Sequence, residues 1–144
     1  MFTNTVSTKW AETIETPVPT IELIIFDIGE VSFGIPITKI DRIISNIHLD
    51  LDHTLTENVT ILDLHDRLTD LAILNPTAIV IFTNEQQQLV GIPINTVPTL
   101  LAVPLDLIRT LPSEFRIGNP LGIASHIAIV PMSMTQITIF ILAN

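Results

Sequence analysis

The stretch LIIFDIGEVSFGIPITKIDRII, residues 23–44, contains two apolar, β-branched runs on either side of a Gly-Glu pair. Such residues suit a pleated, half-buried surface, and a short link that contains glycine is typical of a hairpin turn. We therefore expect strands over 22–28 and 31–37, joined by a turn at Gly29 and Glu30. The second strand ends in the letters GIPI.

A short helix is expected directly after this hairpin. Ile40, Ile43 and Ile44 recur at offsets of three and four residues, which is the spacing of one face of a helix. The pattern predicts a helix over 38–44 that packs these isoleucines inward and exposes the charged residues between them.

The letters GIPI return at residues 91–94, inside AIVIFTNEQQQLVGIPINTVPTLL, residues 78–101. Strand patterns at 78–82 and 88–94 flank a polar turn, as in the first hairpin. The spacing from the phenylalanine of the first strand to the glycine of GIPI differs by one residue between the copies. The matching context predicts one structural unit that occurs twice. The residues after it, 95–101, are expected to form a turn or a helix-like segment.

The rest of the chain adds further short strands. They are expected over 47–51, 59–64, 127–130 and 137–142, with residues 135–136 in the turn before the last strand. In total the pattern predicts about nine or ten strands and two short helices. Several strands contain proline, which confines them to edges or strand ends. An all-β fold of small barrels accommodates such strands better than a flat central sheet.

Composition narrows the function. The chain has 144 residues, 47% of them hydrophobic, and a mean hydropathy of +0.56, enough for one domain or for two small packed subdomains. Its net charge of -9, with six Lys and Arg, argues against binding nucleic acid or an anionic membrane surface. The absence of cysteine excludes disulfides, thiolate metal sites and a cysteine nucleophile.

The ends of the chain and its apolar runs predict a cytoplasmic protein. Polar residues and prolines interrupt every apolar run before it is long enough to span or insert into a bilayer. The first residues lack the basic start and apolar core of a signal peptide. Residues 1–20 are polar and threonine-rich, so we expect a flexible N-terminal tail there, with Trp10 docking on the body of the protein. The folded part is expected over 21–144.

Candidate catalytic groups are few. Asp27-Ile28-Gly29 is faintly similar to the Asp-Thr-Gly of aspartic proteases, but isoleucine replaces the hydroxyl residue that this chemistry needs. His48, Asp50 and Asp52 share one face of an expected strand and could bind a divalent ion, or could simply form a polar surface. No glycine-rich phosphate loop or nucleophile elbow is present. We therefore predict no catalytic, cofactor or metal site, and a binding or scaffolding protein in place of an enzyme.

The order of the motifs resembles that of CheW-like domains. The stretch 23–44 is similar to that family's opening hairpin, and VTILDLHDRL (59–68) to its Val-Pro-Ile-Val-Asp-Leu-Arg strand. AIVIF…QLVGIPINTV, VPLDLIRTLPSEF (103–115) and LGIASHIAIV (121–130) resemble its later segments in the same order. The resemblance implies two pseudo-repeated, intertwined five-stranded SH3-like β-barrels packed on a shared hydrophobic core.

The resemblance also implies partners and contact residues. Family members are noncatalytic adaptors that couple the regulatory domain of a CheA-type histidine kinase to the cytoplasmic tip of methyl-accepting chemoreceptors, in chemotaxis or twitching motility. By this resemblance, Ile40, Asp41 and Arg42 fall on the receptor-facing surface, and Asp63 and His65 fall on the matched Asp-Leu-Arg motif. These five residues are the predicted partner-binding site.

Three departures from the family pattern stand out. Arg42 replaces a commonly acidic residue, and His65 replaces a common arginine. Residues 53–56 replace the Asn-Leu-Arg-Gly loop associated with receptor binding, with Leu55 nearest to the arginine, in a connector that is short over 45–58. The alternatives are a small dimeric aspartic-type or metal-dependent hydrolase, and a self-associating structural β-barrel domain.

Overall fold

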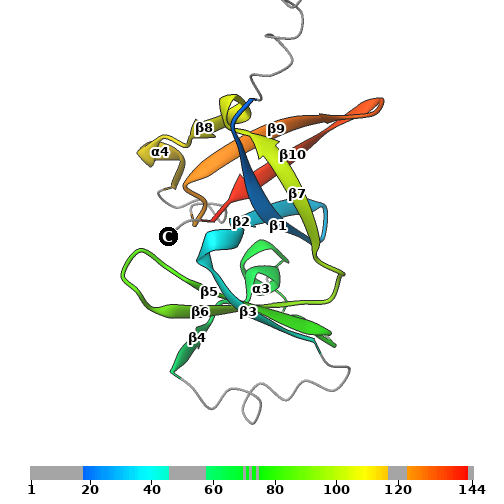
Figure 1. The fold of residues 1–144 in the computed structure, drawn as a ribbon. Helices are drawn as coiled ribbons and strands as arrows, with labels where there is room; N and C mark the ends of the chain where they lie inside the picture. Colours follow the sequence, from blue (N-terminus) through cyan, green and yellow to red (C-terminus); the bar gives the residue numbers. More distant parts are fainter. Residues whose placement is uncertain are drawn as a thin grey trace, which may run out of the picture.

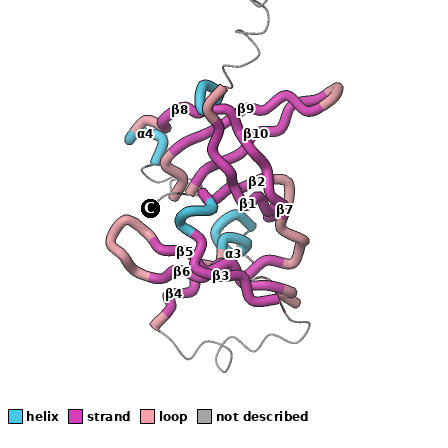
Figure 2. Tube along the Cα trace, viewed as in Figure 1, coloured by secondary structure: helices cyan, strands magenta, loops and turns pink. Residues whose placement is uncertain are grey.

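The computed structural model describes residues 18–45, 58–69, 71, 73, 75–116 and 123–142. Over these residues the chain forms two curled sheets, drawn one above the other in Figure 1, with short helical segments at their ends and between them (Figure 2). The six-stranded sheet has the order β7-β1-β2-β10-β9-β8, and the four-stranded sheet has the order β3-β5-β6-β4.

The strands of the six-stranded sheet are β1 (Thr20–Ile28), β2 (Val31–Pro36), β7 (Thr99–Pro104), β8 (Ile108–Thr110), β9 (His126–Met132) and β10 (Thr135–Ile141). Those of the other sheet are β3 (Ile40–Ser45), β4 (Val59–Ile61), β5 (Ala78–Thr83) and β6 (Leu89–Ile94). The helical segments are η1 (Ile37–Lys39), α3 (Leu64–Thr69), η2 (Leu105–Leu107) and α4 (Ser113–Arg116).

The two hairpins that end in GIPI are equivalent in the two sheets. β1 pairs antiparallel with β2, and β5 pairs antiparallel with β6. A further strand adds in parallel to the second strand of each hairpin: β10 to β2, and β4 to β6. Another strand adds antiparallel to the first: β7 to β1, and β3 to β5. The expected repeat is therefore present as two copies of a four-stranded unit.

The two units exchange their connecting strands. After β2 the chain passes through η1 into β3, which pairs with β5 of the other sheet. After β6 the chain passes into β7, which returns to β1. Each hairpin is thus followed by a strand of the opposite sheet, which interlocks the two sheets along the chain.

β5 is buried on both faces over most of its length, and β1 has buried side chains on both faces toward its end, which explains their nearly continuous apolar sequence. In β1, Leu23 and Ile25 face the interior of the six-stranded sheet, whereas Phe26 and Ile28 face the other sheet. Because side chains alternate across a strand, one strand serves two cores. The same alternation holds in β5, where Val80 and Phe82 face the shared core.

The core between the sheets contains side chains from both. Phe26 and Phe33 lie opposite each other across the first hairpin, with ring centroids 5.9 Å apart, a cross-strand aromatic pair that stabilises a sheet. Helix α3, which lies between the sheets in Figure 1, adds Leu64. The other buried members of this shared core are Ile28, Ile35, Ala78, Val80, Phe82, Ile92, Ile94, Leu111, Ala124 and Leu142.

The predicted helix over 38–44 is wrong, and the structure shows why. After the short turn η1, residues Ile40–Ser45 form β3, with a β-bulge between Ile40 and Arg42. An extra residue in a strand shifts the side-chain alternation by one position. The bulge places Ile40 and Ile43, three residues apart, on the same core-facing side, which gives a strand the spacing of a helix.

Other segments differ from expectation in detail. The expected turn or helix over 95–101 gives way to β7 from Thr99, and the strand expected over 59–64 ends at Ile61, before α3. The final turn falls at Ser133, which has a positive φ of 53°, and not at 135–136. The strand expected over 47–51 lies outside the described residues. None of the helices in the part that the structure describes has the length and apolarity to cross a membrane.

Candidate functional site

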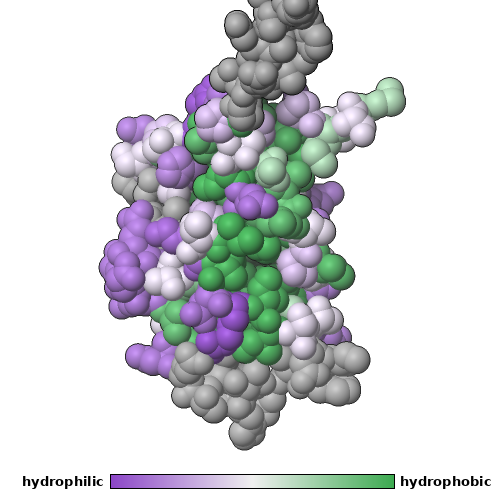
Figure 3. All heavy atoms as spheres, in the orientation of Figure 1, coloured by the Kyte–Doolittle hydropathy of each residue, from purple (hydrophilic) through white to green (hydrophobic). Residues whose placement is uncertain are grey.

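The outer face of β1 and β7 exposes apolar side chains beside the boundary between the sheets. Ile24 lies directly opposite Leu100, and Glu22 lies opposite Ala102. Leu100 is 53% exposed, although its neighbours Leu101 and Val103 pack into the interior. Figure 3 shows an apolar band that runs down this side of the molecule, over β1 and β7 and toward β3.

The first GIPI copy extends this apolar surface, and the second does not. Ile94 is fully buried and pairs with Ala78. Ile37, at the same place in the first copy, is 42% exposed because the chain leaves the sheet at Pro36 and turns into η1. η1 lies against β1. We call Ile24, Ile37, Leu100 and Ala102 the junction face.

Three predicted contact residues lie on β3, an edge strand of the four-stranded sheet. Ile40 is half-buried and packs against the shared core opposite Phe82. Asp41 is the extra residue of the bulge, and its carboxylate accepts a hydrogen bond from the guanidinium of Arg42 at 2.6 Å. Of the three, the charged pair is the part that faces outward, and Ile40 belongs largely to the core.

The other two predicted contact residues, Asp63 and His65, lie at the start of α3 and have local partners. The Asp63 carboxylate accepts hydrogen bonds from the N–H of Asp66 and the N–H of Ile73, each at 3.0 Å. It therefore caps the helix and ties it to the following segment. The ring of His65 donates from Nδ1 to the backbone oxygen of Leu71 at 2.8 Å. These contacts give both residues a role in holding the local fold.

The residues considered for catalysis do not assemble a site within the described ranges. Asp27 lies on the exposed end of the first hairpin, where its carboxylate accepts a hydrogen bond from Ser32 at 2.7 Å. No group of three or more His, Asp or Glu among the described residues could hold a metal ion. His48, Asp50, Asp52 and Leu55, with the rest of 53–56, lie outside the described residues.

The exposed side of β7 is the part of the surface that the sequence does not predict. Leu100 and Ala102 alternate with the inward-facing Leu101 and Val103, but all four are apolar, so the period of two is not visible in the letters. Pro98, a residue type that limits a helix, directly precedes an edge strand here. The exposed face of β7 can be identified only from its pairing with β1, which is seen in the structure and not in the sequence.

Strand edges form a second kind of surface. In the described part of the chain β7 and β8 end the larger sheet, and β3 and β4 end the smaller one. An edge strand has backbone N–H and C=O groups that can pair with another chain. β7 is therefore notable for combining an edge with the apolar junction face.

Comparison with known proteins confirms the fold class. No family model matches the sequence, and no curated protein matches it. Among solved structures, the fold is similar to that of the scaffolding protein TtCheW from Thermoanaerobacter tengcongensis, with a TM-score of 0.60. The two are 15% identical, and the match covers 88% of this chain and 85% of the other. The chain thus has a CheW-like fold of two SH3-like β-barrels on a shared core.

Proposed function

We propose that this protein is a noncatalytic adaptor that couples a CheA-type histidine kinase to methyl-accepting chemoreceptors in chemotaxis-type or twitching-motility signalling. The observation that carries the proposal is the exposed apolar junction face on a CheW-like fold. A protein interior excludes such side chains from water, and an exposed patch of them at a boundary between two sheets is typical of an interaction surface. According to this proposal, the protein acts by binding other proteins.

Two modes of contact are available to the two partners. The junction face offers Leu100 and Ile37, which are 53% and 42% exposed, to an apolar surface of a receptor tip. The edge strands offer backbone groups that the regulatory domain of the kinase can pair with by adding a strand. The two surfaces meet at β7, so that one adaptor contacts both partners close together.

Charge selects among partners. The chain carries a net charge of -9, and the Asp41–Arg42 pair on β3 brings one of its few basic groups to an edge. Arginine stands there in place of an acidic residue that is common in the family. Reversing one charge at an interface changes partner choice more than overall affinity. We therefore expect the charge of the partner's contact surface to differ from that of a chemoreceptor bound by a typical CheW protein.

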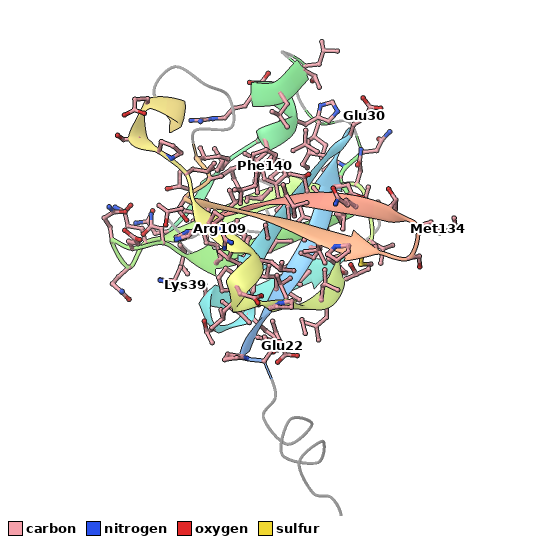
Figure 4. The ribbon with its side chains drawn as sticks, turned by 90° about the horizontal axis from the view of Figure 1, so that it is seen from above. Glu22, Glu30, Lys39, Arg109, Met134 and Phe140 are labelled. Atoms are coloured by element: carbon pink, nitrogen blue, oxygen red, sulfur yellow. The ribbon has the colours of Figure 1, made fainter. Side chains whose placement is uncertain are left out.

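Calorimetric titration of the folded chain with the kinase regulatory domain and with the receptor tip tests the proposal. Leu100→Glu puts a charge on the junction face, and we expect it to weaken binding about tenfold or more. Met134→Glu is the matched control, because Met134 is fully exposed at the tip of the β9–β10 hairpin (Figure 4). The proposal fails if the folded chain binds neither partner at high-micromolar concentration.

Self-association is the competing use of the same face. Sedimentation analysis of the unmodified chain distinguishes self-association from binding to the kinase and the receptor. A stable dimer that Leu100→Glu dissolves, together with no binding to kinase or receptor, would assign the junction face to a second copy of the chain.

A further inference from the structure

The larger barrel has an apolar pocket at one end. Its volume is about 280 Å³, and the residues that line it are Ile21, Pro36, Leu105, Ile108, His126 and Ile141. They come from the start of β1, the end of β2, the end of β10 and the start of β9, with η2 and β8 at the side. These strand ends meet at one mouth of the barrel, a frequent place for a binding pocket. We call it the mouth pocket.

The N-terminal segment begins at the rim of the mouth pocket. The N–H of Leu105 donates a hydrogen bond to the backbone oxygen of Pro19 at 2.9 Å, and Thr20 pairs with Pro104. Figure 1 shows β1 starting beside η2, and Figure 4 places Glu22 at this end of the barrel. Leu105, at the rim, is 48% exposed. The N-terminal segment therefore leaves the described part of the chain at Val18, close to the exposed side chain of Leu105.

The N-terminal segment before Val18 contains an indole ring, which suits this pocket. Residues 1–17 are mostly polar, and Trp10 is the single tryptophan of the chain. An indole ring combines a large apolar surface with an N–H that needs a partner on burial. The mouth pocket matches this combination, because five of its lining residues are apolar and His126 adds one polar ring.

The residues between Trp10 and Val18 are numerous enough to let the indole reach the mouth pocket, and few enough to keep the entropy cost of docking low. Trp10 precedes Val18 by 18 − 10 = 8 residues, which span at most about 27 Å when extended. Pro19 is hydrogen-bonded to Leu105, which lines the pocket, so this reach is ample. A loop of this length costs little entropy to close, and tethering gives a high effective concentration at the pocket.

We propose that Trp10 binds in the mouth pocket of its own chain, against Leu105 and Ile108. Docking there covers the side chain of Leu105, which is 48% exposed. The proposal concerns a surface apart from the junction face and does not depend on the adaptor function.

Tryptophan fluorescence of the full chain tests this directly, since the chain has one tryptophan and no tyrosine. We expect blue-shifted emission and weak quenching by iodide. Leu105→Asp should shift the emission to the red and raise the quenching constant several-fold. Ile129→Asp is the matched control, because Ile129 is also 48% exposed but lies outside the mouth pocket, and it should leave both values unchanged.

Three outcomes would overturn the proposal: emission and quenching equal to those of a free peptide of residues 1–17, an unchanged spectrum in a folded Leu105→Asp variant, or a blue shift that disappears on dilution. The last would place Trp10 in a second copy. Circular dichroism reports whether the variant folds. If it does not, nuclear Overhauser contacts between the Trp10 indole and the methyl groups of Leu105 or Ile108 in the unmodified chain decide, and their absence counts against the proposal.

Discussion

The backbone oxygen of Gly34 accepts a hydrogen bond from the N–H of Leu142 at 2.9 Å, just beyond the pairing of β2 with β10. Gly91 accepts the equivalent bond from Leu62 at 2.8 Å, just beyond the pairing of β6 with β4. The glycine of each GIPI copy thus has the same position in its sheet, at the end of the parallel pairing with the added strand. The repeated letters mark a repeated structural position.

Both glycines lie where an added side chain would be tightly packed. A Cβ on Gly34 would lie 3.0 Å from side-chain atoms of Ile139 and Ile25, and one on Gly91 would lie 3.1 Å from Val59. We expect Gly34→Ala to lower the free energy of unfolding by about 1–3 kcal/mol through overpacking, and Gly91→Ala by somewhat less. Denaturant titration measures both values.

Gly29 provides the control for this prediction. It has a φ of +62°, but a Cβ added to it would meet no atom within 4 Å, so Gly29→Asn, which tolerates that conformation better than most residues, should cost less than Gly34→Ala. Equal stability of the Gly34→Ala variant and the unmodified chain would show that the barrel interior is looser than the structure indicates.

The shared core should make the two sheets unfold together. Phe82 belongs to the four-stranded sheet and is 1% exposed in the shared core. We expect Phe82→Ala to cost about 3–5 kcal/mol and to lower amide protection in β1 and β2 as well as in β5. Val130→Ala is the control, because Val130 lies in the separate core of the larger sheet. It should leave amide protection in β5 largely unchanged. Loss of protection confined to the smaller sheet would mean that the barrels are independent units.

The hairpins could be predicted from the sequence because their signals are local. Gly29 does occupy a turn with positive φ, and the spacing from Phe82 to Gly91 matches that from Phe26 to Gly34 apart from one turn residue. Strand pairing over short loops depends on neighbouring residues, and the sequence displays those residues directly.

The predictions failed where the fold depends on distant partners. Ile40 and Ile43 have helical spacing because a bulge lies between them, and a bulge exists only in a paired strand. Leu100 is exposed because it lies on the outer face of β7, opposite to the face from which Leu101 and Val103 pack inward. Of the predicted site, the placement of Asp63 on a matched motif did not reveal that its carboxylate also ties α3 to the segment that follows, since the Ile73 N–H that it binds lies 10 residues away.

Asp63 offers a test that separates folding from partner binding. Replacing it with alanine removes both of its hydrogen bonds, and we expect a loss of about 1 kcal/mol in stability. Asp63→Asn keeps an oxygen that can cap the helix and should recover most of that loss. If the asparagine variant is as stable as the unmodified chain but binds the kinase domain much more weakly, the residue contacts the partner, as the sequence resemblance predicts.

The Asp41–Arg42 pair should matter more for recognition than for stability. Both side chains are 36% exposed, and an exposed ion pair contributes less than about 1 kcal/mol. We expect Arg42→Glu to change the unfolding free energy within that limit while altering affinity for the receptor tip, most clearly at low ionic strength. Met134→Glu again controls for added charge. An unchanged affinity would remove β3 from the proposed interface.

The adaptor role is tested most directly by assembling three components. The kinase regulatory domain is mixed with vesicle-bound receptor tips from the same organism, with and without the folded chain, and the kinase domain that sediments with the vesicles is measured. The adaptor role requires that sedimentation increase with the amount of chain, saturate, and fall when Leu100→Glu replaces the unmodified protein. If the chain is folded and the kinase domain stays in the supernatant at every concentration up to the high-micromolar range, the protein does not couple these partners.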